Sequence, residues 1–182
     1  MKPPSSGRNG TWDSGPSSPD GSPLEADGTV AYKQPVSVLV LVYTRDRTVL
    51  LLERADFPGH WQSVTGSQEP GESLLATASR ELLEETGIDA RSFDTLTDWS
   101  LSNVYEIYPK WRHRYQPGVT HNTEHMFGLE IPAPVPVILN PREHLRFAWM
   151  PWREAAEKCF SWSNRAAIDA LEQRVPVTRT AS

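Results

Sequence analysis

Three glutamates within one predicted helix constrain this chain of 182 residues more than any other feature. The segment Leu74–Thr86 contains neither Gly nor Pro, which predicts a helix. Glu81, Glu84 and Glu85 then stand at positions i, i+3 and i+4 and occupy an arc of roughly 100° on one side of it. Like charges this close repel one another, and the nearest cation in the sequence is Arg80. The cluster therefore predicts a site for a hard divalent cation.

An apolar strip beside the glutamates indicates how this helix is held. Leu75, Ala78 and Leu82 recur at helical spacing, so we expect them to dock the helix on a sheet and to fix the direction of the carboxylates. Gly66, ahead of the helix, leaves room for a ligand to approach the backbone.

Apolar, β-branched runs on both sides of the helix predict the sheet. Strands are expected over Pro35–Tyr43, Thr48–Arg54, Trp61–Thr65, Ser102–Tyr108, Glu124–Ile131 and Leu145–Met150. A closing helix is expected over Arg165–Arg174, with Ser163 as its N-cap. This order of strands and helices predicts an α+β fold.

The first 28 residues differ in composition from the rest of the chain. They contain five Pro, five Gly and six Ser, so they cannot bury enough apolar surface to offset their ordering entropy. We therefore predict a disordered tail over residues 1–28, without the apolar segment of a secretory signal, and a single domain over residues 29–182. A single cysteine, Cys159, excludes an internal disulfide and favours a cytoplasmic location.

The helix and its flanking loops together form a longer pattern. It reads Gly66, five residues, Glu72, seven residues, Arg80-Glu81-Leu82, one residue, Glu84-Glu85, one residue, Gly87-Ile88. The pattern matches the Nudix box at every fixed position, and the chain in this respect resembles the Nudix hydrolases. That resemblance implies an α/β/α sandwich around a mixed β-sheet. It also implies hydrolysis of a diphosphate bond with Mg²⁺ as the cofactor, or Mn²⁺ in its place.

The resemblance also implies roles for the residues of the box. Glu81, Glu84 and Glu85 are the implied metal ligands, together with the carbonyl oxygen of Gly66, and Glu84 and Glu85 are implied to be catalytic. Two other box residues are implied to hold the loop against the helix: Glu72 and Arg80.

Several segments outside the box are similar to bacterial dihydroneopterin triphosphate pyrophosphohydrolases. These segments are Tyr32–Ser37, Trp61–Gly66, Arg112–Val119, Asn122–Glu124, Glu143–Leu145 and Ser161–Arg165. The similarity implies that dihydroneopterin triphosphate is converted to the monophosphate and pyrophosphate, an early step toward folate. It implies that Glu143 binds the metal or acts as general base, with Glu124 as a second candidate. The implied substrate-binding residues are Lys33, Arg54, Thr65 and Ser161.

Competing interpretations accompany these assignments. Lys33 also fits a solvated lysine, and Arg54 also fits one half of a surface ion pair. Of the basic residues Lys110, Arg112 and Arg114, we expect two to lie on a solvated surface and one to face a triphosphate. His144, beside a carboxylate candidate, is expected to be structural.

The alternative substrates are nucleoside triphosphates, such as dATP or an oxidised purine nucleotide. A third hypothesis is a non-catalytic nucleotide-binding module with the same fold. The three intact, mutually repelling glutamates of the box speak against that hypothesis.

The distribution of charge bears on the ligand and the partners. The chain has a net charge of −5, and the segment Gly66–Ile88 alone, with five glutamates and one arginine, contributes −4. The acidity is thus concentrated where a metal ion would bind, and the metal-loaded site should attract a small-molecule triphosphate. We expect neither a nucleic-acid partner nor a membrane partner, and a monomer or a homodimer.

Overall fold

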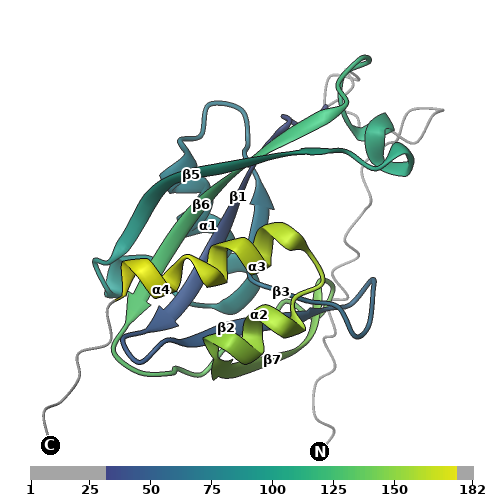
Figure 1. Cartoon of the computed structure of the whole chain (residues 1–182). Coiled ribbons are helices and arrows are strands. Elements are labelled where there is room, and N and C mark those ends of the chain that lie inside the picture. The colour runs from purple at the N-terminus through teal and green to yellow at the C-terminus, as the bar shows by residue number, and fades with distance from the viewer. Residues whose placement is uncertain (1–31, 176–182) are drawn as a thin grey trace, which may run out of the picture.

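A seven-stranded mixed sheet forms the centre of the molecule (Figure 1). The computed structural model describes residues 32–175, so the predicted tail over residues 1–28 lies outside the described residues. The strands are β1 (Val36–Thr44), β2 (Thr48–Arg54), β3 (Trp61–Gln62), β4 (Val64–Ser67), β5 (Leu96–Glu106), β6 (His121–Ile131) and β7 (His144–Pro151). Their order is β3-β2-β1-β6-β5, while β4 pairs with β1 and β7 pairs with β2. Only β1 and β6 run parallel among these pairs.

Helices cover both faces of this sheet (Figure 1). One face carries α1 (Leu74–Thr86), and the other carries α2 (Trp152–Lys158), α3 (Trp162–Asp169) and α4 (Leu171–Arg174). Two 3-10 turns, η1 (Ala90–Ser92) and η2 (Pro109–Arg114), complete the described elements. The predicted α+β class and its α/β/α sandwich are confirmed. Within residues 32–175, no helix combines the length and the hydropathy needed to cross a membrane.

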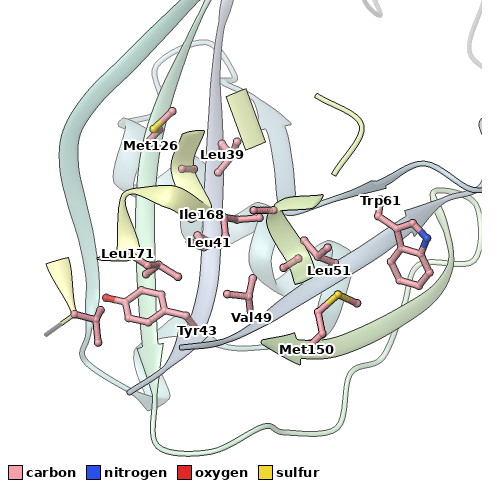
Figure 2. Close-up of a cluster of buried hydrophobic side chains, with 14 of the residues drawn as sticks. Leu39, Leu41, Tyr43, Val49, Leu51, Trp61, Met126, Met150, Ile168 and Leu171 are labelled. Carbon is pink, nitrogen blue, oxygen red and sulfur yellow. The ribbon is translucent and has the colours of Figure 1, made fainter. Parts of the chain in front are cut away.

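The alternation of side chains along β1 separates two cores. Leu39 and Leu41 point toward α3 and α4 (Figure 2), whereas Val38 and Val40 pack with α1. Because both faces of β1 are covered, its side chains form a continuous apolar run rather than an alternating one. The two cores fix α1 and α3 on opposite sides of the same strand.

Of the six predicted strands, β2 has the predicted bounds, β1 and β7 differ by one residue at each end, and β6 begins three residues earlier than predicted, while the other two predictions differ more. β5 begins at Leu96 rather than at Ser102, because a register shift between Asp98 and Leu101 breaks the alternation that predicts a strand. The strand predicted between Trp61 and Thr65 is divided into β3 and β4.

The helical predictions also need correction. The closing helix starts at Trp162, and its N-cap is Ser161, whose side chain accepts a hydrogen bond from the backbone N–H of Asn164. The prediction of Ser163 as the cap is therefore wrong. The short helix α2 is a further element, beyond those that the sequence pattern predicts. Leu75 is 51% exposed, so the docking strip on α1 consists of Ala78 and Leu82.

Candidate metal and phosphate site

Arg80 joins the loop before α1 to the helix itself. Its Nε and Nη2 atoms donate to the two carboxylate oxygens of Glu72 at 2.9 and 3.0 Å, and Nη2 also donates to the carbonyl oxygen of Ser67 at 3.1 Å. The hydroxyl of Thr77 donates to Glu72 at 2.8 Å. The bonds from Arg80, more than those from Thr77, lower the pKa of Glu72 to about 2. Glu72 is thus a charged anchor for the loop, in line with its predicted position.

Glu81 packs against the backbone of β4. Its Oε1 accepts a hydrogen bond from Arg80 at 2.9 Å. A Cβ atom built on Gly66 would lie only 1.8 Å from the carboxyl carbon of Glu81. Burial raises the pKa of Glu81 to about 7, although Arg80 opposes the shift. Glycine at position 66 is therefore what allows this carboxylate to reach the site.

Glu85 lies one helical turn further along α1 and is buried, with 4% of its surface exposed. Its Oε2 is 3.1 Å from Nε2 of His144, at the start of β7. Burial raises the pKa of Glu85, while His144 lowers it to a smaller extent. Glu143 is exposed, and one ligand atom from each of Glu85, Glu143 and His144 lies within 4.8 Å of the others. The loop before β7 thus brings two potential ligands to α1.

The residues present fit a divalent cation. Oε2 of Glu85 and Nε2 of His144 are buried and contact each other at 3.1 Å, and neither these two atoms nor Nδ1 of His144 has another hydrogen-bond partner. A buried carboxylate with so few hydrogen-bond partners is costly, and a bound cation would offset that cost. Glu84 stands at the exposed edge of the same helix face, where it accepts a hydrogen bond from Arg80 at 3.3 Å. The donor set of carboxylate oxygens is the one that Mg²⁺ and Mn²⁺ prefer.

Lys33 adds a positive charge beside these carboxylates. Its Nζ donates to Oγ of Ser67 at 3.4 Å, and its backbone N–H donates to the carbonyl oxygen of Arg114 at 2.8 Å. Burial and, to a smaller extent, the charge of Arg114 lower the pKa of Lys33, whereas Glu81 and Glu143 raise it. The ammonium group of Lys33 is therefore close enough to interact electrostatically with Glu81, Glu143 and Arg114. This position suits a lysine that binds a phosphate group.

The remaining basic residues of the predicted cluster have other contacts. Arg112 forms an ion pair with Glu106. Lys110 lies over the rings of Phe57 and Trp111, at 4.8 and 4.5 Å. Arg112 and Lys110 therefore have partners within the fold, and the expectation that one of the three basic residues faces a triphosphate stays a prediction.

Arg54 and Thr65 are connected through Gln62. Arg54 donates to Oε1 of Gln62 at 3.1 Å, and Nε2 of Gln62 donates to Oγ1 of Thr65 at 3.1 Å. The backbone N–H of Thr65 in turn contacts the carboxylate of Glu85. Arg54 also makes a two-point ion pair with Asp56, at 2.8 and 2.7 Å. The ion-pair interpretation of Arg54 is therefore realised in the structure, next to residues of the site.

Ser161 and His144 each have defined contacts in the structure. The hydroxyl of Ser161 accepts hydrogen bonds from the backbone and side-chain nitrogens of Asn164, at 3.2 and 2.9 Å, as the cap of α3. His144, expected to be structural, lies in the candidate ligand cluster with Glu85 and Glu143, and its 3.1 Å contact with Glu85 is compatible with that structural role.

Carboxylates of one helix with a lysine close to them, on a mixed sheet between two helical layers, fit a metal-dependent hydrolase of phosphoric anhydrides. Residues 33–171 match the NUDIX domain. The chain belongs to the Nudix family and is a Nudix hydrolase.

Two relatives within this family share one activity. The chain is 46% identical over 140 residues to the dihydroneopterin triphosphate diphosphatase of Escherichia coli (strain K12). The aligned region covers 76% of this chain and 92% of that protein. It is 42% identical over 149 residues to the dihydroneopterin triphosphate diphosphatase of Haemophilus influenzae. The aligned region covers 81% of this chain and 93% of that protein.

Solved structures agree with this comparison. The structure of the E. coli dihydroneopterin triphosphate pyrophosphohydrolase matches with a TM-score of 0.70 and 46% identity, over 80% of this chain and 97% of that one. The Ap4A hydrolase of C. elegans in a binary complex matches with a TM-score of 0.58 and 19% identity, over 77% of this chain and 96% of that one, and shares the fold alone.

Proposed function

We propose that this Nudix hydrolase converts dihydroneopterin triphosphate to dihydroneopterin monophosphate and pyrophosphate, with Mg²⁺ as its cofactor and Mn²⁺ as a substitute. The observation that carries the proposal is the 46% identity to a curated relative of that activity over 92% of its length. A second relative with the same name, from another organism, is 42% identical over 93% of its length. Both matches are far longer than the segment Gly66–Ile88, so the Nudix box alone does not account for them.

The box glutamates hold the cation in this proposal. Glu81, Glu84 and Glu85 provide carboxylate oxygens, and the carbonyl of Gly66 and the carboxylate of Glu143 complete the donor set. When bound, the cation neutralises phosphate oxygens and lowers the pKa of water. The buried Oε2 of Glu85, which contacts Nε2 of His144 at 3.1 Å and has no other hydrogen-bond partner, supports this assignment.

Glu143 accepts the proton of the attacking water. The water oxygen forms a bond to phosphorus, the P–O bond of the anhydride breaks, and pyrophosphate leaves. The exposure of Glu143 and its distance of within 4.8 Å from the ligand atom of Glu85 support this role.

Four residues bind the substrate in this scheme. Lys33 pairs with a phosphate oxygen, since its ammonium group lies near both Glu81 and Glu143. Arg54 and Thr65 also bind the substrate, and hydrogen bonds to Gln62 hold these two residues in place. Ser161 binds substrate through its hydroxyl at the start of α3.

A substrate panel tests the proposal. It contains dihydroneopterin triphosphate, dATP, 8-oxo-dGTP, ADP-ribose and diadenosine polyphosphate, each assayed with Mg²⁺ and with EDTA. We expect the highest kcat/KM for dihydroneopterin triphosphate, with pyrophosphate as a product, and no turnover in EDTA. A higher kcat/KM for dATP or 8-oxo-dGTP would establish the alternative substrate class. If none of the five compounds were hydrolysed, the result would favour the hypothesis of a non-catalytic binding module.

The cellular context is part of the same proposal. We place the enzyme in the cytoplasm, as a monomer or a homodimer, with the small-molecule substrate as its partner and with neither nucleic acid nor a membrane. Sedimentation of the purified full chain distinguishes the monomer from the homodimer.

A further inference from the structure

A second group of buried polar atoms lies on the face of the sheet that α3 covers. Within residues 32–175, buried side-chain atoms without a hydrogen-bond partner fall into two groups. Glu85 and His144 form the first group, in the candidate metal site. The second group consists of Oε2 of Glu124, Nδ2 of Asn103 and Oγ of Ser63. Because folded proteins pair nearly all such atoms, the second group also calls for an external partner.

Glu124 is the charged member of this second group. It lies on β6 with only 5% of its surface exposed. In the sheet register it stands opposite Asn103 of β5 and beside Ser37 of β1. Burial raises the pKa of Glu124, although the hydroxyl of Ser163 on α3 donates a hydrogen bond to it. A carboxylate in this position gains stability from a ligand that brings N–H donors.

The surrounding side chains are polar and mutually bonded. Nδ2 of Asn122 donates to Oγ of Ser37 at 2.7 Å and to the hydroxyl of Tyr105 at 3.1 Å. The backbone N–H of Ser63 donates to Oδ1 of Asn164, at 2.6 Å, next to Ser163. Ser63 and Glu124 are therefore both held near the first turn of α3, with unused hydrogen-bonding capacity.

We infer that Glu124 and Asn103 bind the 2-amino-4-oxopyrimidine ring of the substrate and so determine its specificity. This ring presents, along one edge, an amino group, a ring N–H and a carbonyl oxygen. Two adjacent donors followed by an acceptor match a carboxylate followed by an amide NH₂. Adenine presents a different edge, an amino donor beside a ring nitrogen acceptor, and therefore cannot satisfy the carboxylate with two donors. The inference rests on the proposed function and extends it to ring recognition.

The position of Glu124 relative to the phosphate site fits this substrate. Ser37 lies beside Glu124 on one side and pairs with Ser67 of β4 on the other. Ser67 in turn accepts a hydrogen bond from Lys33, which lies near Glu81 and Glu143. Two strand spacings, about 10 Å, therefore separate Glu124 from the strand that carries Ser67. The fused ring and its three-carbon side chain together span roughly 10 Å from the amino edge to the first phosphate oxygen, by ordinary bond lengths, and so fit a separation of this size.

Steady-state kinetics of Glu124→Gln test the inference. Glutamine keeps the size of the side chain but removes one acceptor and the charge. We expect the ratio of kcat/KM for dihydroneopterin triphosphate to kcat/KM for dATP to fall roughly 10- to 150-fold, as for the loss of a hydrogen bond to a charged group. Glu130→Gln is the matched control, because Glu130 lies on the same strand in an exposed ion pair with Arg45 at 3.0 Å, and should preserve the ratio.

A second variant keeps the test informative if Glu124→Gln folds poorly. Asn103 lies on the edge strand β5 and is only half-buried, so Asn103→Ala should fold, and it should lower the same ratio by roughly 5- to 10-fold. An unchanged ratio in both variants, or equal losses with both substrates, would overturn the inference. Failure of the wild-type enzyme to hydrolyse dihydroneopterin triphosphate would instead refute the proposed function itself.

Discussion

The backbone of Gly66 and the carboxylate of Glu81 are in direct contact, so that a Cβ atom at position 66 would lie 1.8 Å from Cδ of Glu81. The atoms that would clash belong to the end of a flexible side chain. A larger residue at position 66 is therefore accommodated by moving the carboxylate, and the effect falls on the metal site rather than on the core.

Gly66→Ala should therefore weaken metal binding while leaving the fold intact. We expect the Mg²⁺ concentration for half-maximal activity to rise roughly 10- to 100-fold, the range found when groups that position ligands are changed. Activity titrated with Mg²⁺ measures this, and a thermal melt checks the fold. In combination with Glu81→Gln, the two losses should not add, because both act through one carboxylate. Additive losses would contradict the mechanism.

Glu84→Gln and Glu85→Gln should each lower kcat at least 10²-fold, because each removes a charge that holds the cation. The fold should persist, since Glu84 is exposed and glutamine removes the desolvation cost of a charge at the buried position of Glu85. Turnover and circular dichroism measure the two effects. Glu69→Gln, at an exposed position in the same loop, is the control. Full activity in either variant would remove the metal-site assignment.

Much of the fold was predictable because local sequence and tertiary environment agree. α1 and β2 have the predicted bounds, since an uninterrupted helical pattern and a short apolar run leave one interpretation each. β5 was predicted too short because its bulge, with Ser100 at a φ of 54°, breaks the period of two. This bulge arises from the pairing of β5 with β6. Pairing between distant segments cannot be read from the local sequence of β5.

The candidate site likewise has parts that the sequence predicts and parts that it does not. Residues of one helix, such as Glu81 and Glu85, have a spacing that the sequence displays. Contacts between distant segments, such as those of His144 with Glu85 or of Glu124 with Ser163, depend on strand register and helix docking. The carboxylates of the candidate metal site on α1 are therefore predictable from the sequence, whereas the sequence indicates Glu124 only as a second candidate base.

Deleting residues 1–28 should leave kcat and KM unchanged. The NUDIX domain match begins at residue 33, beyond the deleted segment, and the predicted domain begins at residue 29. Kinetics of the truncated and full chains under identical conditions measure the effect. A loss of activity would show that the N-terminal segment contributes to catalysis.

Glu143→Gln should slow hydrolysis and retain substrate binding. Glutamine cannot accept the proton of the attacking water, but it still offers an oxygen at the edge of the site. We expect a fall in kcat of roughly 10²- to 10⁴-fold, the typical contribution of a general base, with little change in KM. Single-turnover kinetics and equilibrium binding separate the two steps. Unchanged hydrolysis would assign the base to another residue.

Stability in acid should report the ion pair between Glu72 and Arg80. The pKa of Glu72 in the folded protein is about 2, below its ordinary value of 4.5, chiefly because of the hydrogen bonds from Arg80. A lowered pKa stabilises the folded state fully above pH 4.5, and this contribution is lost as the pH falls toward 2. Wild type should therefore melt roughly 3 to 10 °C above Glu72→Gln at pH 7.

That difference in Tm should stay constant down to about pH 5 and shrink progressively between pH 4.5 and 2. Thermal melts of both proteins across this range measure it, with Glu69→Gln as the control, because Glu69 contributes its backbone N–H to Glu72 but its side chain accepts no hydrogen bond from Arg80. If the difference between wild type and Glu72→Gln were the same at pH 2.5 as at pH 7, the stabilisation would arise from packing of the side chain. The charge of Glu72 would then not be what holds the loop against α1.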